Sequence, residues 1–184
     1  LKYGREENKI YGILFDGAYL WEEYIWTILT NLGFKHPQNK TRIGGINLLE
    51  KGWKVFPDFY KINKETNKNI VLDTKYKRLA NKNKEYIDRN DKHQIISYVY
   101  TLGAKKGGFV YPSENKFSFD NIGILNREYN KNILEDYSPS IFKYAFLIPN
   151  KKSNEENFEN INDFKKEIEK SENDFKEKIK NEFQ

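Results

Sequence analysis

The sequence contains no cysteine and no methionine. Without cysteine the chain can form neither a disulfide bond nor a thiolate metal site, which suits a reducing compartment, so we expect a cytoplasmic protein. No segment resembles a signal peptide, and no apolar run approaches the roughly 18 residues that a membrane span needs, so we expect no membrane partner. Because the sequence begins with leucine and lacks methionine, we also expect it to be part of a longer chain.

The composition that remains is sufficient for a packed core. Of the 184 residues, 38% are hydrophobic and 16% are aromatic, and this length suits one domain. The net charge of +5 is compatible with a polyanionic partner but does not identify one. No repeat or second domain is evident, so we expect a single domain over residues 1–184. Its core spans about residues 13–150, and an amphipathic helix follows over about residues 154–184.

Hydrophobic spacing with a helical period predicts three helices. The first runs from about Gly17 to Leu32, the second lies in segment 93–104, and the third is the amphipathic segment at the end. We expect the third helix to break near Ser171. The polar segment 81–93 is predicted to be a loop that leads into the second helix.

Apolar runs bounded by turn residues predict the strands. We expect one or two strands in segment 41–62, a strong strand at 70–77, a short one at 107–112 and another at 140–149. Segment 113–136 is predicted to be irregular. The order of helices and strands predicts an α/β fold in which a small mixed sheet is flanked by helices.

Three charged residues stand where strands should build a core: Asp58, Asp73 and Lys75. If the chain turns at Glu65–Thr66 and forms an antiparallel hairpin, Asp58 faces Asp73. Directly opposed side chains share a face, with Cβ atoms about 5 Å apart, and Lys75 lies on the same face because strand side chains alternate. A shift of one residue in the register would move Asp58 to the other face.

Two adjacent carboxylates repel each other unless a cation lies between them. Hard oxygen ligands suit Mg²⁺ better than Zn²⁺, and Mn²⁺ is the expected substitute. Lys75 would then orient the attacking water or stabilise charge on a phosphoryl group. The alternative is an ordinary hairpin with solvated charges, which is the commoner explanation of an isolated D-x-K motif.

Several motifs in order resemble a known nuclease superfamily. Pro57-Asp58, followed by Asp73-x-Lys75 after an apolar strand, resembles the PD-(D/E)xK signature. LWEEYIW resembles the acidic motif of that superfamily's first helix, and Gln94-x-x-x-Tyr98 resembles the helix motif of its restriction and Cas4-like branches. Together these motifs look most like the nuclease domain of McrC, the cleavage subunit of McrBC-type, 5-methylcytosine-specific restriction systems. LlaJI-type restriction endonucleases share this domain.

The resemblance implies a restriction-endonuclease-like core and a metal-dependent DNA endonuclease. Asp58 and Asp73 would bind the metal, and Lys75 would be the catalytic lysine. A glutamate of the first helix would complete the metal shell, and Gln94 would contact the Lys75 region or the DNA backbone. The resemblance also implies an McrB-like AAA+ GTPase partner that chooses the target and hydrolyses NTP, and no small-molecule substrate.

Glu22 and Glu23 both lie on the predicted first helix. The apolar face of this helix is centred between Trp21 and Ile28, so Glu22 falls on its border and Glu23 points almost opposite. Because only a border residue can reach a site at the sheet edge, we predict that Glu22 is the third metal ligand.

Candidate DNA contacts surround these residues. The basic residues that follow the D-x-K motif are Lys77, Arg78 and Lys82, and their place beside the site makes phosphate contacts plausible. Tyr98 shares the helix face of Gln94. Lys40 and Arg42 form a second and weaker basic set.

Five other residues are assigned structural roles. Asp16 is predicted to cap the first helix, and His36 to lie on the surface. Thr74 is expected to point into the layer opposite Asp73, and Tyr76 to join the core. His93 points about 100° away from its neighbour Gln94, so it is the weaker candidate for a direct role.

Two other functions are compatible with the same motifs. One is a repair or Cas4-like nuclease, although Cas4-like proteins carry cluster-binding cysteines that this sequence lacks. The other is a non-catalytic adaptor with a degenerate nuclease fold that binds DNA or a motor protein. The intact Asp58, Asp73 and Lys75 argue against degeneracy.

Overall fold

The computed structural model describes residues 15–38, 40–66, 68–76, 87–114, 118–124, 137–149 and 161–183. The helices in these ranges are α1 (Gly17–Leu29), continued by the 3-10 turn η1 (Thr30–Leu32), α2 (Arg89–Thr101) and α3 (Ile161–Phe183). The strands are β1 (Ile46–Asn47), β2 (Lys54–Val55), β3 (Phe59–Lys61), β4 (Asn69–Thr74), β5 (Ala104–Ser113), β6 (Ser118–Ile124) and β7 (Ser140–Leu147). Within this part of the chain, no helix combines the length and apolar character needed to cross a membrane.

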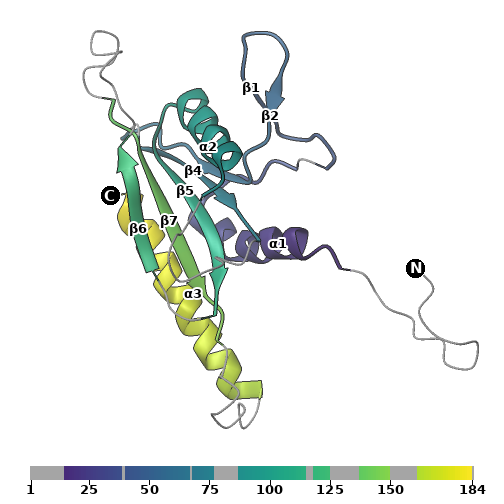
Figure 1. The fold of residues 1–184 in the computed structure, drawn as a ribbon, viewed down its shortest axis with the longest axis vertical. Coiled ribbons are helices and arrows are strands. Elements are labelled where there is room, and N and C mark those ends of the chain that lie inside the picture. Colours follow the sequence, from purple (N-terminus) through teal and green to yellow (C-terminus); the bar gives the residue numbers. More distant parts are fainter. Residues whose placement is uncertain are drawn as a thin grey trace, which may run out of the picture.

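Five strands form one mixed sheet in the order β3-β4-β5-β7-β6. The central pairs β4–β5 and β5–β7 are parallel, whereas the outer pairs β3–β4 and β6–β7 are antiparallel. Strands β1 and β2 form a separate antiparallel ribbon that projects away from the main sheet (Figure 1). The predicted α/β fold, a small mixed sheet flanked by helices, is confirmed, and the arrangement is compatible with a restriction-endonuclease-like core.

Helices cover both faces of the sheet, so its central strands are buried on both sides. On one face, Ile25 of α1 and Leu72 of β4 belong to one core cluster, in which Phe175 of α3 packs against Tyr144 and Phe146 of β7. On the other face, α2 packs through Val99 against Val71. The neighbours Val71 and Leu72 therefore belong to opposite core clusters, which explains the continuous apolar run of β4.

The first helix begins and ends where the sequence indicates. Asp16 caps it by accepting a hydrogen bond from the backbone N–H of Tyr19 at 3.1 Å. Its 3-10 extension ends at Gly33, whose φ of 77° is the left-handed conformation that favours glycine. The predicted cap and the predicted end at Leu32 are both confirmed.

Three predictions about the remaining elements are wrong. Segment 113–136 was predicted to be irregular but contains β6. This edge strand has no buried residue, so it lacks the alternation of buried and exposed positions by which a strand is recognised. Helix α3 continues through Ser171, because the Ser171 hydroxyl is satisfied by the carbonyl oxygen of Glu167 at 3.2 Å. Helix α2 begins at Arg89, inside the predicted loop, because Asp88 caps it.

Candidate active site

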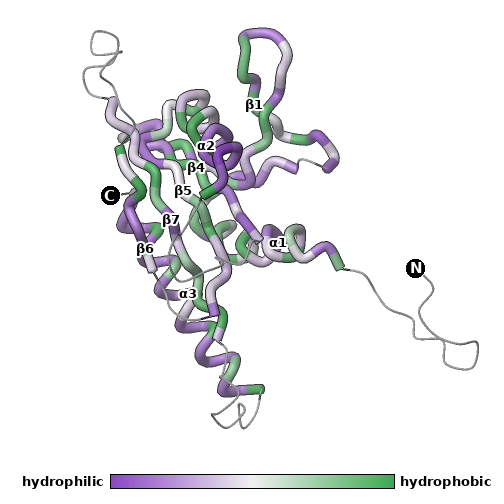
Figure 2. Tube along the Cα trace, in the orientation of Figure 1, coloured by the Kyte–Doolittle hydropathy of each residue, from purple (hydrophilic) through white to green (hydrophobic). Residues whose placement is uncertain are grey.

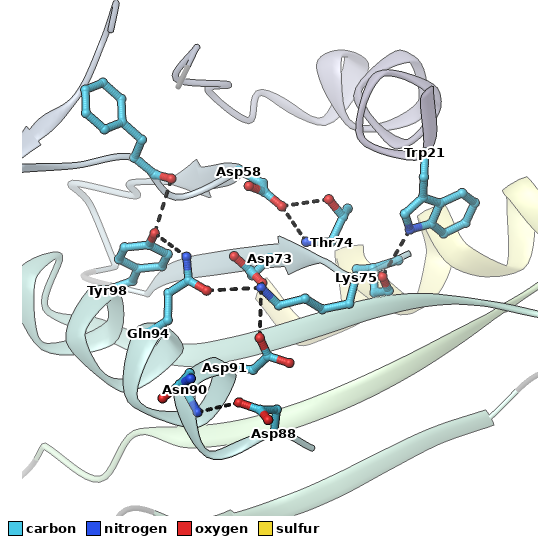
Figure 3. A network of polar contacts seen from close by, with 12 residues as sticks. Trp21, Asp58, Asp73, Thr74, Lys75, Asp88, Asn90, Asp91, Gln94 and Tyr98 are labelled. Carbon is cyan, nitrogen blue, oxygen red and sulfur yellow. Dashed lines mark hydrogen bonds and ion pairs between the residues drawn. The ribbon is translucent and has the colours of Figure 1, made fainter. Parts of the chain in front are cut away.

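The β3–β4 hairpin has the predicted register. Tyr60 lies opposite Val71, and Phe59 lies opposite Leu72. In the turn, the side-chain oxygen of Asn63 accepts hydrogen bonds from two following backbone N–H groups, which fixes the reversal of the chain. The confirmed register brings Asp58, just before β3, to the end of β4 near Asp73 (Figure 3).

The side chain of Asp58 is held by Thr74, the residue that follows Asp73. Its Oδ2 accepts hydrogen bonds from the backbone N–H and from the hydroxyl of Thr74, both at 2.6 Å. Burial raises the pKa of Asp58, although these two bonds oppose the shift. The Thr74 hydroxyl, which was predicted to point into the layer opposite Asp73, thus contacts Asp58. Asp58 precedes the ladder of β3, so strict alternation does not govern its side chain, which reaches the Thr74 hydroxyl.

Lys75 lies at the centre of a polar network. Its Nζ is 2.6 Å from Oδ2 of Asp73 and 3.3 Å from Oδ1 of Asp91, and it donates a hydrogen bond of 3.0 Å to Oε1 of Gln94 (Figure 3). Gln94 in turn donates to the Tyr98 hydroxyl at 2.8 Å. The structure thus brings together four residues selected from the sequence, and it adds Asp91.

The charges in this network influence one another because they are partly removed from water. Burial and the negative charge of Asp58 raise the pKa of Asp73 to about 7, against the opposing effect of Lys75. Burial by itself would lower the pKa of Lys75, but the Asp73, Asp91 and Asp58 carboxylates raise it above its ordinary value. Lys75 is therefore a cation at neutral pH. It lies beside the carboxylates of Asp73 and Asp91, which repel each other.

Glu22 extends the site onto α1. Burial and the carboxylate of Asp58 raise the pKa of Glu22 to about 7, while His36 opposes the shift, so Glu22 and Asp58 are electrostatic neighbours. The side chain of Glu22 is 25% exposed, compared with 42% for Glu23. Glu23, predicted to point almost opposite, nevertheless lies beside it, because the carboxylates of Glu22 and Glu23 are both 3.7 Å from Nε2 of His36. The choice of Glu22 as the metal ligand stays a prediction.

One backbone carbonyl joins α1 to the strand that carries the lysine. The oxygen of Val110 on β5 accepts a hydrogen bond from the indole N–H of Trp21 at 3.2 Å and another from the backbone N–H of Lys75 at 3.0 Å (Figure 3). Trp21 is buried directly before Glu22 on α1. This shared acceptor fixes the helix next to the end of β4.

His36 was predicted to lie on the surface, and that prediction is wrong. Its side chain is only 7% exposed and packs against the rings of Trp26 and Phe59, with centroid distances of 5.2 and 4.9 Å. Its Nδ1 donates to the backbone carbonyl oxygen of Asp58 at 2.8 Å, and its Nε2 lies 3.7 Å from Glu22. Sequence reasoning missed it because an isolated bridge between Lys35 and Tyr60 brings it to the site, and no local pattern reports that bridge.

Asp91 was also missed, because segment 81–93 was predicted to be a loop. Asp91 is 8% exposed in the first turn of α2. A signal for it was present, since Asp88 is a good helix cap. A helix beginning after Asp88 places Asp91 three residues before Gln94, on the same face.

The other predictions for polar residues have mixed outcomes. Tyr76 is 58% exposed, so its assignment to the core is wrong; β4 ends at Thr74, and the Tyr76 ring instead covers Gly17. His93 is exposed. The candidate DNA contacts Lys77, Arg78 and Lys82 lie outside the described residues.

The donor chemistry of the site fits a hard divalent cation. Among the residues described by the structure, no three His, Asp or Glu side chains form a ready-made metal cluster. However, the half-buried Asp58 and the buried Asp73 are neighbours whose raised pKa values reflect an unrelieved cost of negative charge, which a cation would relieve. Asp58 uses one oxygen for Thr74 and keeps the other for a ligand. With Glu22 these carboxylates supply the oxygen donors that Mg²⁺ prefers.

Comparison with known proteins identifies the family of this segment. The model of the McrBC 5-methylcytosine restriction system component family matches residues 1–112. This range contains α1, both hairpins and α2, and therefore every site residue described above. Among curated proteins, none matches the chain.

Proposed function

The chain belongs to the McrBC 5-methylcytosine restriction system component family, and from this premise we propose that it is the McrC-like cleavage subunit, a metal-dependent DNA endonuclease of the PD-(D/E)xK type. As a component of a restriction system, it has DNA as its target. The observation that carries the proposal is the meeting of Asp58, Asp73 and Lys75 at one end of the β3–β4 hairpin. Such a combination of carboxylates and a fixed cation can support metal-dependent phosphodiester hydrolysis.

Glu22, Asp58 and Asp73 would hold Mg²⁺, or Mn²⁺ as a substitute. The bound cation would neutralise these carboxylates and polarise the scissile phosphate. The burial of Asp73 and the partial burial of Asp58 support this role, because a pair of carboxylates withdrawn from water is costly without a counter-charge. An acidic pair that functions with a bound cation is expected to have this electrostatic cost when the cation is absent.

Lys75 would act on the reacting phosphate from a fixed position. Its ammonium group has contacts with Asp73, Asp91 and Gln94, so little side-chain freedom remains to be lost when DNA binds. Its raised pKa keeps it charged at neutral pH. It would donate a hydrogen bond to the attacking water or to a non-bridging oxygen, where negative charge grows during the reaction.

The proposed partner is an McrB-like AAA+ GTPase. Residues 1–184 contain no G-x-x-x-x-G-K-[ST] sequence, so nucleotide hydrolysis would come from another subunit. We propose that this subunit delivers methylated DNA to the site and that the cleavage reaction is carried by the chain described here.

The proposal is tested with the chain purified together with the AAA+ GTPase of its restriction system. A methylated plasmid should be cut in the presence of GTP and Mg²⁺, and EDTA should stop the reaction until Mg²⁺ is restored. Cutting that persists in EDTA would exclude the proposed metal chemistry. A complex that binds DNA but cuts it with neither Mg²⁺ nor Mn²⁺ would identify the chain as an adaptor.

His36 gives a prediction about positioning within the site. Replacing it with alanine removes the donor to the Asp58 carbonyl and the ring that packs against Trp26 and Phe59. We expect His36→Ala to raise the Mg²⁺ concentration for half-maximal cleavage by about tenfold, since residues that orient metal ligands have effects of this size. The rate at saturating Mg²⁺ should change much less.

His93→Ala is the matched control, because His93 is exposed on α2. A Mg²⁺ titration of both variants, together with their unfolding temperatures, separates positioning from general destabilisation. If His36→Ala loses rate at saturating Mg²⁺ and keeps the original midpoint, His36 does not position the metal ligands.

A further inference from the structure

The β1–β2 hairpin exposes apolar side chains away from the protein core. Leu48, Leu49 and Trp53 in its loop are 37%, 54% and 76% exposed. The hairpin projects beyond the sheet and its helices (Figure 1), and hydrophobic stretches remain visible along it (Figure 2). A group of large apolar side chains at a projecting tip marks a surface that another molecule covers.

The backbone of the loop keeps Trp53 in this exposed position. Trp53 has a φ of 38°, in the left-handed region that bulky side chains rarely adopt. A hydrogen bond of 2.8 Å from the N–H of Leu48 to the carbonyl oxygen of Trp53 closes the loop. Such backbone strain is found at functional positions. Here it accompanies an indole that contributes nothing to the core.

The charge of the same segment indicates the kind of molecule that covers it. Residues 40–55 contain four basic side chains, Lys40, Arg42, Lys51 and Lys54, all of them exposed. The segment has one acidic residue, Glu50. Exposed aromatic and aliphatic groups interleaved with cations match a nucleic acid, which offers both phosphates and base faces. A second copy of the chain would instead bring like charges together.

The base of the hairpin is fixed to the candidate active site. Strand β2 ends at Val55, three residues before Asp58, and the carbonyl of the intervening Phe56 accepts a hydrogen bond from Tyr98 at 3.3 Å. Phe56 is buried, and Gly45 packs so closely on its ring that a Cβ there would lie 2.5 Å from it. The guanidinium of Arg42 lies 5.6 Å from the centre of the same ring. The hairpin therefore has a defined position relative to Asp58.

We propose that the β1–β2 hairpin is a DNA-binding element that contacts the duplex beside the scissile phosphate. Arg42, Lys51 and Lys54 bind backbone phosphates, and Trp53 with Leu48 contacts bases or sugars. This inference rests on the proposed function, because its ligand is the DNA that the site cleaves. It attributes part of the DNA-binding affinity to this chain itself, separately from any motor subunit.

The test measures binding of a fluorescein-labelled DNA duplex by anisotropy in EDTA, over a series of salt concentrations, with the chain alone and in its complex. Trp53→Ala should weaken binding roughly tenfold at every salt concentration, because it removes an apolar contact. Lys51→Gln combined with Lys54→Gln should reduce the slope of log affinity against log salt by about two, because two phosphate contacts are lost. DNA should also quench the emission of Trp53 in the original chain.

Matched controls lie far from the hairpin in sequence and have similar exposure. Ile124→Ala removes an apolar side chain that is 67% exposed, and Lys165→Gln with Lys166→Gln removes two exposed lysines of α3. Both controls should bind like the original chain. Hairpin variants that also bind like it, or an original chain that does not bind DNA, would overturn the inference.

Two further outcomes are decisive. If Trp53→Ala changes the sedimentation of the chain or of its complex while DNA affinity stays the same, the hairpin is a protein interface and the inference is wrong. Because binding is measured without metal, its failure is distinct from failure of the nuclease proposal. A chain that needs its hairpin for DNA binding but never cuts DNA keeps this inference and loses the proposed function.

Discussion

Replacing Lys75 with alanine is expected to slow DNA cleavage by about 10²–10³-fold, the loss seen when one fixed donor to a developing negative charge is removed. The Lys75 ammonium is the cation that the site itself provides, held within 3.3 Å of Asp73, Asp91 and Gln94. Strand β4 contains no lysine that could take over the role of Lys75. The measurement is the single-turnover cleavage rate of the complete restriction complex at saturating Mg²⁺.

Because Lys75→Ala removes the ammonium group beside Asp73 and Asp91, its unfolding temperature must be measured as well. Lys75→Gln, which keeps hydrogen-bonding capacity without the charge, should lose activity to the same extent and separates the two effects. Lys105→Ala is the control, since Lys105 is an exposed lysine on β5. A folded Lys75 variant that cuts at the original rate would show that the active site lies elsewhere.

Asp73→Asn is expected to abolish the stabilisation of the chain by Mg²⁺ or Mn²⁺. A cation present at 100 times its Kd stabilises the folded state by about 2.7 kcal/mol, which corresponds to about 5–10 °C for a chain of this size. In the metal-free state the variant should be no less stable than the original chain. It removes a buried carboxylate whose pKa is raised to about 7 by burial and by Asp58.

The experiment is a thermal unfolding series over increasing Mn²⁺, which needs neither DNA nor a partner subunit. Asp174→Asn serves as the control because Asp174 is exposed on α3, and it should keep the full response. An original chain that gains no stability from Mg²⁺ or Mn²⁺ would contradict the metal assignment. So would an Asp73→Asn variant that still responds.

The sequence was sufficient to predict the register that brings Asp58 close to Asp73, because a local turn determines it. Asn63 and the turn that follows it fix where the chain reverses, and the pairing of β3 with β4 follows from that position. The buried face of α1, formed by Trp21, Ile25, Ile28 and Leu29, follows from helix periodicity in the same way. Each of these features depends on residues close together in sequence, for which propensity and period are informative.

Other features could not be predicted because they depend on contacts between distant segments. His36 reaches Asp58 over 22 residues through a single bridge, and nothing in its own neighbourhood indicates burial. Strand β6 is an exposed edge strand that is fixed by pairing with β7 rather than by its own apolar pattern. Asp91 is different, since the cap at Asp88 was a readable signal.

The carbonyl oxygen of Val110 fixes the position of α1 relative to Lys75. It receives both the Trp21 indole, on the helix that carries Glu22, and the backbone of Lys75. Val110 is completely buried in a central strand, so the spacing between the acidic helix and the lysine is set inside the sheet and is independent of surface loops. Loops and hairpins around this centre can therefore be lengthened, shortened or exchanged to suit different DNA targets without changing the distance between α1 and Lys75.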